Sequence, residues 1–147
     1  MPELPGGIPV PPHAYVPGQN ARHPDDWFDT IKDSVTPGMP VSALGQTQAF
    51  HAGLAYLEAG YFWECHEVLE AVWLHTPQDT PEREMVQALI QLANAQLKIR
   101  MDRPKAAKRL CEMVQNHLQR IEGEGAILGR RPEDVRMILN GVRNALR

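Results

Sequence analysis

Residues 61–74 have the sequence YFWECHEVLEAVWL, in which apolar side chains recur at helical spacing and charged side chains lie between them. At about 3.6 residues per turn, the apolar members of this stretch fall on one stripe of a helix. They are Phe62, Cys65, Leu69, Val72 and Trp73. The glycine before the stretch, Gly60, is a residue that commonly ends a preceding helix. The sequence therefore predicts a helix over about 61–74 that packs against neighbouring helices through this stripe.

Helical periodicity continues through most of the chain on either side of this stretch. We expect one helix before it, over about 43–59, and three helices after it, beginning near Pro81, Pro104 and Pro132. Proline suits the first position of a helix, and Thr80 is placed to cap the first of the three. No segment alternates with a period of two, so no sheet is predicted. Short links favour antiparallel neighbours, and the predicted fold is an all-α antiparallel bundle of three main helices plus one or two flanking helices.

The first 41 residues differ in composition from the rest and are called the arm. Nine of the thirteen prolines lie before Val41, which excludes long helices and central strands there. The arm also holds Tyr15, Trp27 and Phe28, so we expect it to be extended and packed on the body from about Tyr15, with one helical turn near 25–33. Residues 1–12 are expected to be disordered. Residues 42–147 are expected to form a single helical domain.

The composition is that of an ordinary globular protein. The chain has 147 residues, of which 43% are hydrophobic and 22% charged, with a formal net charge of −3. It contains no apolar run of the length that a membrane span needs and no signal-peptide core at its start. Two cysteines are too few for a disulfide framework and indicate a reducing compartment. We therefore expect a soluble cytoplasmic protein that does not associate with membranes.

The same stretch carries a cluster of ionisable side chains beside its apolar stripe. Helical geometry places His66 at the edge of the buried face, Glu70 directly above it, and Glu67 next outward. Glu64 is predicted to point furthest from the core, and Trp63 to border the polar strip, where it would contact the arm or a second copy of the chain.

The next helix offers a polar strip that faces this cluster. Its residues recur at spacings of four, three and four, and so share one side of the helix; they are Gln87, Gln91, Asn94 and Lys98. The sequence predicts a site in which His66, Glu67 and Glu70 face Gln87 and Gln91, with the amides and Trp63 contacting any ligand.

These motifs resemble a known family. The run FWECHEVLE at 62–70, the tryptophan at Trp73 and the run QALIQLA at 87–93 are similar to the signature of domain-of-unknown-function family 309, over about residues 47–121. The arm sequences YVPG at 15–18 and His23-Pro24 are similar to an N-terminal segment of some members. The resemblance implies a small prokaryotic all-helical protein with a compact three-helix bundle and the same polar patch. It implies no activity.

The polar cluster is compatible with three kinds of site. His66, Glu67 and Glu70 are candidate ligands of a divalent metal, the one cofactor that the pattern suggests, although the cluster holds a single histidine and further ligands would have to come from His23, His51 or His117. The same three residues are candidate catalytic groups, with a glutamate as general base and His66 as its partner. The third reading is a structural network that fixes the helix register. The sequence does not decide whether the protein is an enzyme.

A different class of function follows from the charge distribution. Residues 1–97 hold three basic and twelve acidic side chains, whereas residues 98–147 hold twelve basic and six acidic ones. A basic half is typical of proteins that contact an acidic protein or nucleic acid. The absence of Phe, Tyr and Trp from this half argues against stacking on bases, and hence against nucleic acid. The alternative function is thus a structural or interaction module whose basic C-terminal half contacts an acidic protein or nucleic acid. A basic face that is only solvated, or that complements the acidic half of the same or a neighbouring molecule, would give the same charge distribution. The partner classes that we expect for the chain as a whole are a small molecule, a protein or a second copy of the chain.

Overall fold

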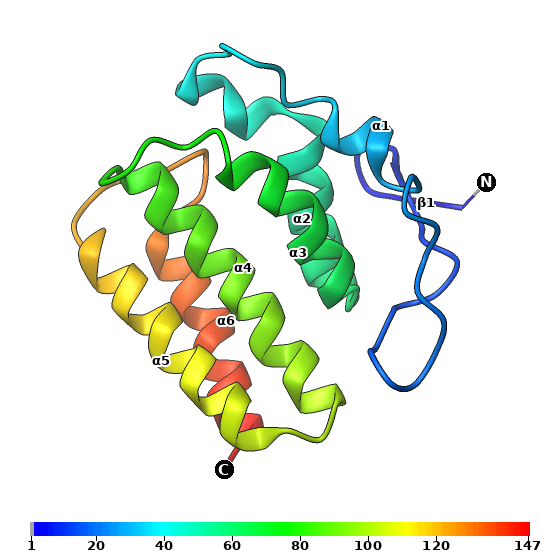
Figure 1. Cartoon of the computed structure of the whole chain (residues 1–147). Coiled ribbons are helices and arrows are strands. Elements are labelled where there is room, and N and C mark those ends of the chain that lie inside the picture. The colour runs from blue at the N-terminus through cyan, green and yellow to red at the C-terminus, as the bar shows by residue number, and fades with distance from the viewer. Residues whose placement is uncertain (1) are drawn as a thin grey trace.

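The computed structural model describes residues 2–147, and most of them are helical (Figure 1). Two short strands come first and a short helix and a 3-10 segment follow, before five longer helices complete the chain. The elements are β1 (Glu3–Leu4), β2 (Ile8–Pro9), α1 (Asp29–Lys32), the 3-10 helix Val41–Gln46, α2 (Gln48–Ala59), α3 (Phe62–Trp73), α4 (Pro81–Arg100), α5 (Pro104–Arg120) and α6 (Pro132–Ala145). The predicted all-helical bundle is confirmed in this broad form.

Proline and threonine set the starts of several helices, as the sequence predicts. Pro81, Pro104 and Pro132 each occupy the beginning of a helix. The hydroxyl of Thr80 accepts a hydrogen bond from the backbone N–H of Arg83, which supplies one of the partners that a helix start lacks. Gly60 ends α2 in the left-handed conformation, with φ 88°.

The start of the helix expected over 43–59 differs from the prediction. Residues 41–46 form a 3-10 helix, and α2 begins only after Thr47, whose hydroxyl accepts from the N–H of Phe50. Thr47 is extended, with ψ 152°, so the two helical segments meet at an angle instead of forming one rod. Threonine is a residue type that favours the position before a helix, so Thr47 marks this boundary in the sequence. The prediction rested on apolar periodicity, which does not detect such a cap.

The expectation of no sheet was wrong at the N-terminus. Strands β1 and β2 pair antiparallel around the turn Pro5-Gly6-Gly7, in which both glycines have positive φ. The hairpin is fixed to the body because Ile8 is buried and the hydroxyl of Tyr56 donates to the carbonyl of Pro9 at 2.8 Å. Residues 2–12 are therefore placed on the bundle, contrary to the expectation of disorder, with Ile8 and the Tyr56–Pro9 hydrogen bond as anchors. Residue 1, which the same expectation included, lies outside the described residues.

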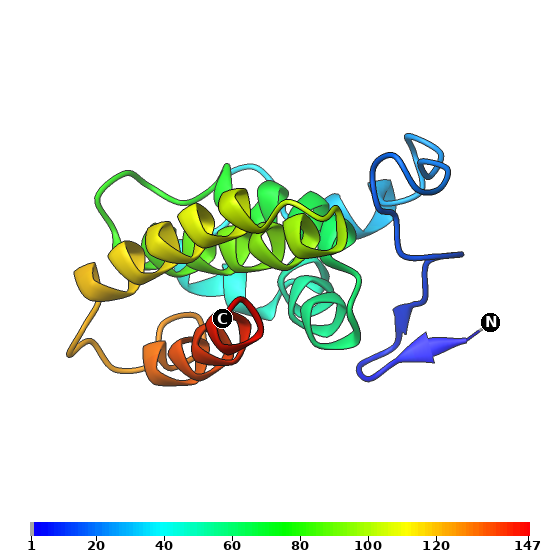
Figure 2. The ribbon, with the colours of Figure 1, turned by 90° about the horizontal axis from the view of Figure 1, so that it is seen from below.

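The bundle is arranged around α4. Helices α3 and α5 pack on α4 from two sides, α2 packs on α3, and α6 packs on α4 and α5. Figure 2 shows α2 lying between α6 on one side and the N-terminal hairpin on the other. The largest fully buried side chains come from every layer, including Phe28 of the arm, Phe50 and Tyr56 of α2, Leu69 of α3 and Leu89 of α4. Within residues 2–147 no helix combines the length and the apolar character that crossing a membrane requires.

Helices α2 and α3 approach closely at one glycine. A Cβ added to Gly53 would lie 2.3 Å from Cδ2 and 2.5 Å from Cγ of Leu69, whose side chain is fully buried. Nonbonded carbon atoms do not approach each other this closely, so the helices would have to move apart or Leu69 would have to leave its rotamer.

We predict that Gly53→Ala lowers the free energy of unfolding by about 1–3 kcal/mol, because overpacking outweighs the gain in helix propensity. Gly141→Ala is the matched control: Gly141 lies in α6 with no atom near the added Cβ, so this change should stabilise the protein by about 0.5–1 kcal/mol. Urea unfolding of both variants tests the prediction. Equal stabilisation by the two changes would show that the close α2–α3 approach is not a constraint.

Candidate functional site

Glu64 is the most deeply buried charged side chain of the polar stretch, with 0% of its surface exposed. Its Oε2 accepts from the backbone N–H of Tyr15 at 2.8 Å and lies 2.6 Å from Nε2 of His23. The prediction that Glu64 points furthest from the core is wrong, because the arm covers that side of α3. A carboxylate withdrawn from water needs such partners, and both come from residues more than forty positions earlier in the chain.

Aromatic rings enclose this buried pair. The His23 ring lies 4.6 to 6.4 Å, centroid to centroid, from the rings of His13, Tyr15, Trp27, Phe28 and Trp63. Among the described residues, Nδ1 of His23 and Oε1 of Glu64 are buried without a hydrogen-bond partner. The hydrogen-bond pattern thus assigns the proton to Nε2, because a proton on Nδ1 would leave a buried donor unpaired. Burial also raises the pKa of the neighbouring Cys65 thiol and of the Tyr56 hydroxyl, and the Glu64 charge adds to both effects.

The structure brings four of the predicted site residues together on the opposite edge of α3. His66, Glu70, Gln87 and Gln91 line a surface pocket of about 230 Å³ between α3 and α4, which we call the α3–α4 pocket. Nε2 of His66 lies 3.2 Å from Oε2 of Glu70, one turn further along the helix. His66 is 29% exposed at its side chain and Glu70 54%, so both groups are open to solvent.

Three further residues complete the α3–α4 pocket, namely Trp73, Ile90 and Asn94. Asn94 donates from Nδ2 to Oε1 of Gln91 at 3.3 Å, which orients the Gln91 amide. The guanidinium of Arg83 lies 4.0 Å from the centroid of the Trp73 ring, and the indole Nε1 is buried with no partner among the described residues. The sequence did not indicate Trp73 as a pocket residue, because its spacing also suits the apolar stripe.

Glu67 and Trp63 lie away from this pocket. Glu67 forms an ion pair with Lys32 of α1, with Oε1 and Nζ 2.5 Å apart. Trp63 packs edge-on against Tyr15 at 5.1 Å between ring centroids and has the guanidinium of Arg22 5.6 Å from its ring. Both residues therefore hold the arm against α3, which is one of the two positions expected for Trp63. The helix pattern alone could not show that Glu67 lies outside the pocket that holds His66 and Glu70, because the partner of Glu67, Lys32, is on the arm.

The other histidines considered as metal ligands have different neighbours. His23 bonds Glu64, Nδ1 of His117 lies 2.6 Å from Oε2 of Glu84, and His51 is exposed on α2. Across residues 2–147, no three side chains of His, Cys, Asp or Glu are grouped so that they could hold a metal ion. In the α3–α4 pocket a cation would meet one imidazole and one carboxylate, with amide oxygens as further oxygen donors.

In a comparison with known proteins, the helical centre of the chain matches one family profile. Residues 50–110, from Phe50 in α2 to Leu110 in α5, match the profile of the family described as Domain of unknown function (DUF309). The match confirms the resemblance seen in the motifs of α3 and α4, and it includes every residue of the α3–α4 pocket. No curated protein and no solved structure matches the chain.

We predict that Glu64→Ala lowers the free energy of unfolding by about 2–6 kcal/mol, because it leaves two donors, His23 Nε2–H and the Tyr15 N–H, without an acceptor at about 1–3 kcal/mol each. The same change should release the arm and so accelerate tryptic cleavage after the exposed Arg22. Glu67→Ala breaks the more exposed Lys32 pair and should cost less than about 1 kcal/mol, with little change in cleavage. Similar losses in the two variants, measured by urea unfolding and limited proteolysis, would contradict the assignment of Glu64 as the anchor.

Proposed function

We propose that the protein binds a small polar ligand with an amino or guanidino group in the α3–α4 pocket. Residues 50–110 match a family of unknown function, so the proposal rests on the geometry of this pocket. The observation that carries the proposal is that His66 and Glu70 face the amides of Gln87, Gln91 and Asn94 across one solvent-open pocket. Sites for small molecules combine such convergent polar groups with an apolar surface, which Trp73 and Ile90 provide here.

The charge of the pocket favours a cationic ligand group. Glu70 is the one acidic side chain that lines the pocket, and its carboxylate accepts hydrogen bonds from an ammonium or guanidinium. The amide side chains supply both donors and acceptors for the remainder of the ligand. A volume of about 230 Å³ limits the ligand to a small molecule.

A divalent metal ion is the alternative occupant of the same pocket. Two protein ligands, His66 and Glu70, are fewer than a structural or catalytic zinc site uses. An organic amine needs no fixed coordination number, and for this reason the amine is the proposed ligand. For both the amine and the metal ion, the negative charge that binds the cation is that of Glu70.

We predict that putrescine or agmatine shifts the indole N–H resonance of Trp73 and the side-chain amide resonances of Gln87 and Gln91 in two-dimensional NMR spectra. Glu70→Gln should weaken binding at least about tenfold, because a charge-assisted hydrogen bond contributes about 1.5–3 kcal/mol. Glu112→Gln, an exposed change on α5, should leave binding unaltered.

The same spectra with zinc or magnesium chloride decide between the two occupants. Shifts with zinc and none with either amine would replace the amine proposal by a metal site. An absence of shifts at these resonances with all four probes would contradict ligand binding at this pocket.

The basic surface of α5 supports a second candidate function, contact with an acidic protein. Lys105, Lys108 and Arg109 are exposed, and none of the three is in an ion pair with another described residue. Two other basic residues of this half have structural partners: Arg100 donates to the carbonyl of Gly60 and lies over the Phe62 ring, and Arg120 pairs with Glu84. The surface available to a partner is thus narrower than the charge count suggests.

We predict that the protein is retained on immobilised poly-L-glutamate and eluted by moderate salt, since exposed charges are screened over about 10 Å at 0.1 M. Charge reversal at Lys105, Lys108 and Arg109 should abolish retention, while Arg131→Glu should shift it slightly. Retention unaffected by the triple reversal would reject this surface, and stronger retention on single-stranded DNA would favour nucleic acid instead.

A further inference from the structure

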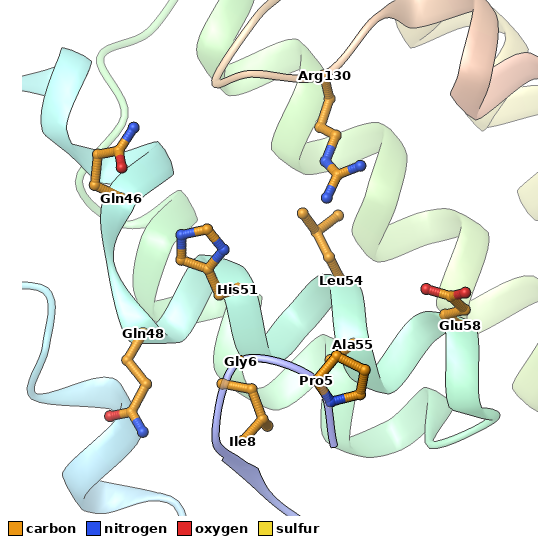
Figure 3. Close-up of a pocket in the computed structure, with 10 residues that line it drawn as sticks. All are labelled: Pro5, Gly6, Ile8, Gln46, Gln48, His51, Leu54, Ala55, Glu58 and Arg130. Atoms are coloured by element: carbon orange, nitrogen blue, oxygen red, sulfur yellow. The ribbon is translucent and has the colours of Figure 1, made fainter. Parts of the chain in front are cut away.

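A larger concave surface lies on the other side of the bundle, along α2. Two adjoining hollows of about 550 and 440 Å³ share the lining residues Leu54, Glu58 and Arg130. The first is bordered by Pro5, Gly6 and Ile8 of the N-terminal hairpin, and the second reaches α4 and α6. Figure 3 shows Arg130 extending from its loop toward Leu54, with His51 and Glu58 to either side. We call the two hollows together the α2 groove.

The backbone of the loop that carries Arg130 is held by specific contacts. Ile127 and Arg130 exchange both backbone hydrogen bonds, at 2.7 and 2.9 Å, around the turn Leu128-Gly129. Leu128 has a φ of 54°, a left-handed conformation that is unfavourable for leucine and persists only where the surrounding contacts enforce it. The turn rests on Gly45, where an added Cβ would lie 3.0 Å from the carbonyl oxygen of Leu128. The backbone from which the Arg130 side chain extends is therefore fixed before any ligand arrives.

Opposite charges line the α2 groove without touching. Glu58 of α2 and Asp134 of α6 are exposed and line the groove with Arg130, yet no ion pair within 4.0 Å joins Arg130 to either carboxylate. A guanidinium and a carboxylate that face one space at a distance are complementary to a molecule that carries both charges.

The second hollow also has an apolar wall. Leu57 and Leu89 are buried beneath it, Val135 lies beside them, and Ile138 remains 42% exposed although it is a large aliphatic residue. An apolar body placed here would remove the Ile138 side chain from water, which favours binding in proportion to the apolar surface covered.

We propose that the α2 groove binds a small zwitterion with an apolar body, that is, an apolar amino acid or a short apolar peptide with both ends free. The carboxylate of the ligand pairs with Arg130, and its ammonium group pairs with Glu58 or Asp134. The apolar body covers Ile138, beside the buried Val135. An anion without an ammonium group is disfavoured by the two carboxylates, and a simple amine is disfavoured by Arg130.

Titration of the full chain with four probes tests this proposal, with backbone amide shifts at Leu54, Leu57, Val135 and Ile138 as the readout. The probes are L-leucine, the dipeptide leucyl-leucine, 4-methylpentanoate, which lacks the ammonium group, and 3-methylbutylamine, which lacks the carboxylate. We expect leucine or leucyl-leucine to bind at least about tenfold more tightly than either half-charged probe. The tighter of the two zwitterions tells whether the ligand is an amino acid or a peptide.

Variants identify the two charges that the proposal requires. Arg130→Gln and the combined change Glu58→Gln with Asp134→Asn should each weaken binding of the zwitterion at least about tenfold, and the two single acidic changes tell which carboxylate pairs with the ammonium group. Arg131→Gln, one residue away and outside the groove lining, should leave binding unchanged. Thermal unfolding of each variant checks that the fold is kept. Equal binding of 4-methylpentanoate and leucine, equal effects of the Arg130 and Arg131 changes, or no shift with either zwitterion would overturn the proposal.

Discussion

A single buried carboxylate connects the two unlike parts of this chain. Glu64 belongs to the central part of the bundle, and both of its hydrogen-bond donors belong to the proline-rich arm. Because an unpaired charge in a protein interior is strongly unfavourable, α3 in its present position requires the arm, and the arm in turn has few regular backbone hydrogen bonds of its own. Trp63, Tyr15 and Phe28 add apolar burial around the pair, so that the two parts stabilise each other.

The arm also determines which charges of α3 remain available for binding. It covers Glu64 completely and engages Glu67 through Lys32, while His66 and Glu70 on the other edge stay open between α3 and α4. The helix thus has one charged side with a structural role and one with solvent-exposed groups. The α2 groove adds a site of different chemistry, in which apolar surface separates opposite charges, whereas the α3–α4 pocket is rich in amides.

Local sequence patterns predicted the elements well and the environment of individual side chains less well. The helix starts at Pro81, Pro104 and Pro132 follow from backbone constraints that act within one turn. His66 and Glu70 facing Gln87 and Gln91 also followed from the pattern, since both pairs lie on consecutive helices that pack together. Glu64 could not be placed in this way, because its burial depends on residues 41 and 49 positions earlier. The same limit applies to the α2 groove, whose charges come from α2, the Arg130 turn and α6.

Amide hydrogen exchange at Tyr15 tests the role of the buried carboxylate most directly. Tyr15 lies in the arm outside any helix or strand, and its N–H is bonded to Oε2 of Glu64. If Glu64 anchors the arm, this amide exchanges at least about a hundredfold more slowly than in an unstructured peptide and loses that protection in Glu64→Ala. Exchange of the Tyr15 amide at the unprotected rate in the unaltered protein would show that the arm is not held by Glu64.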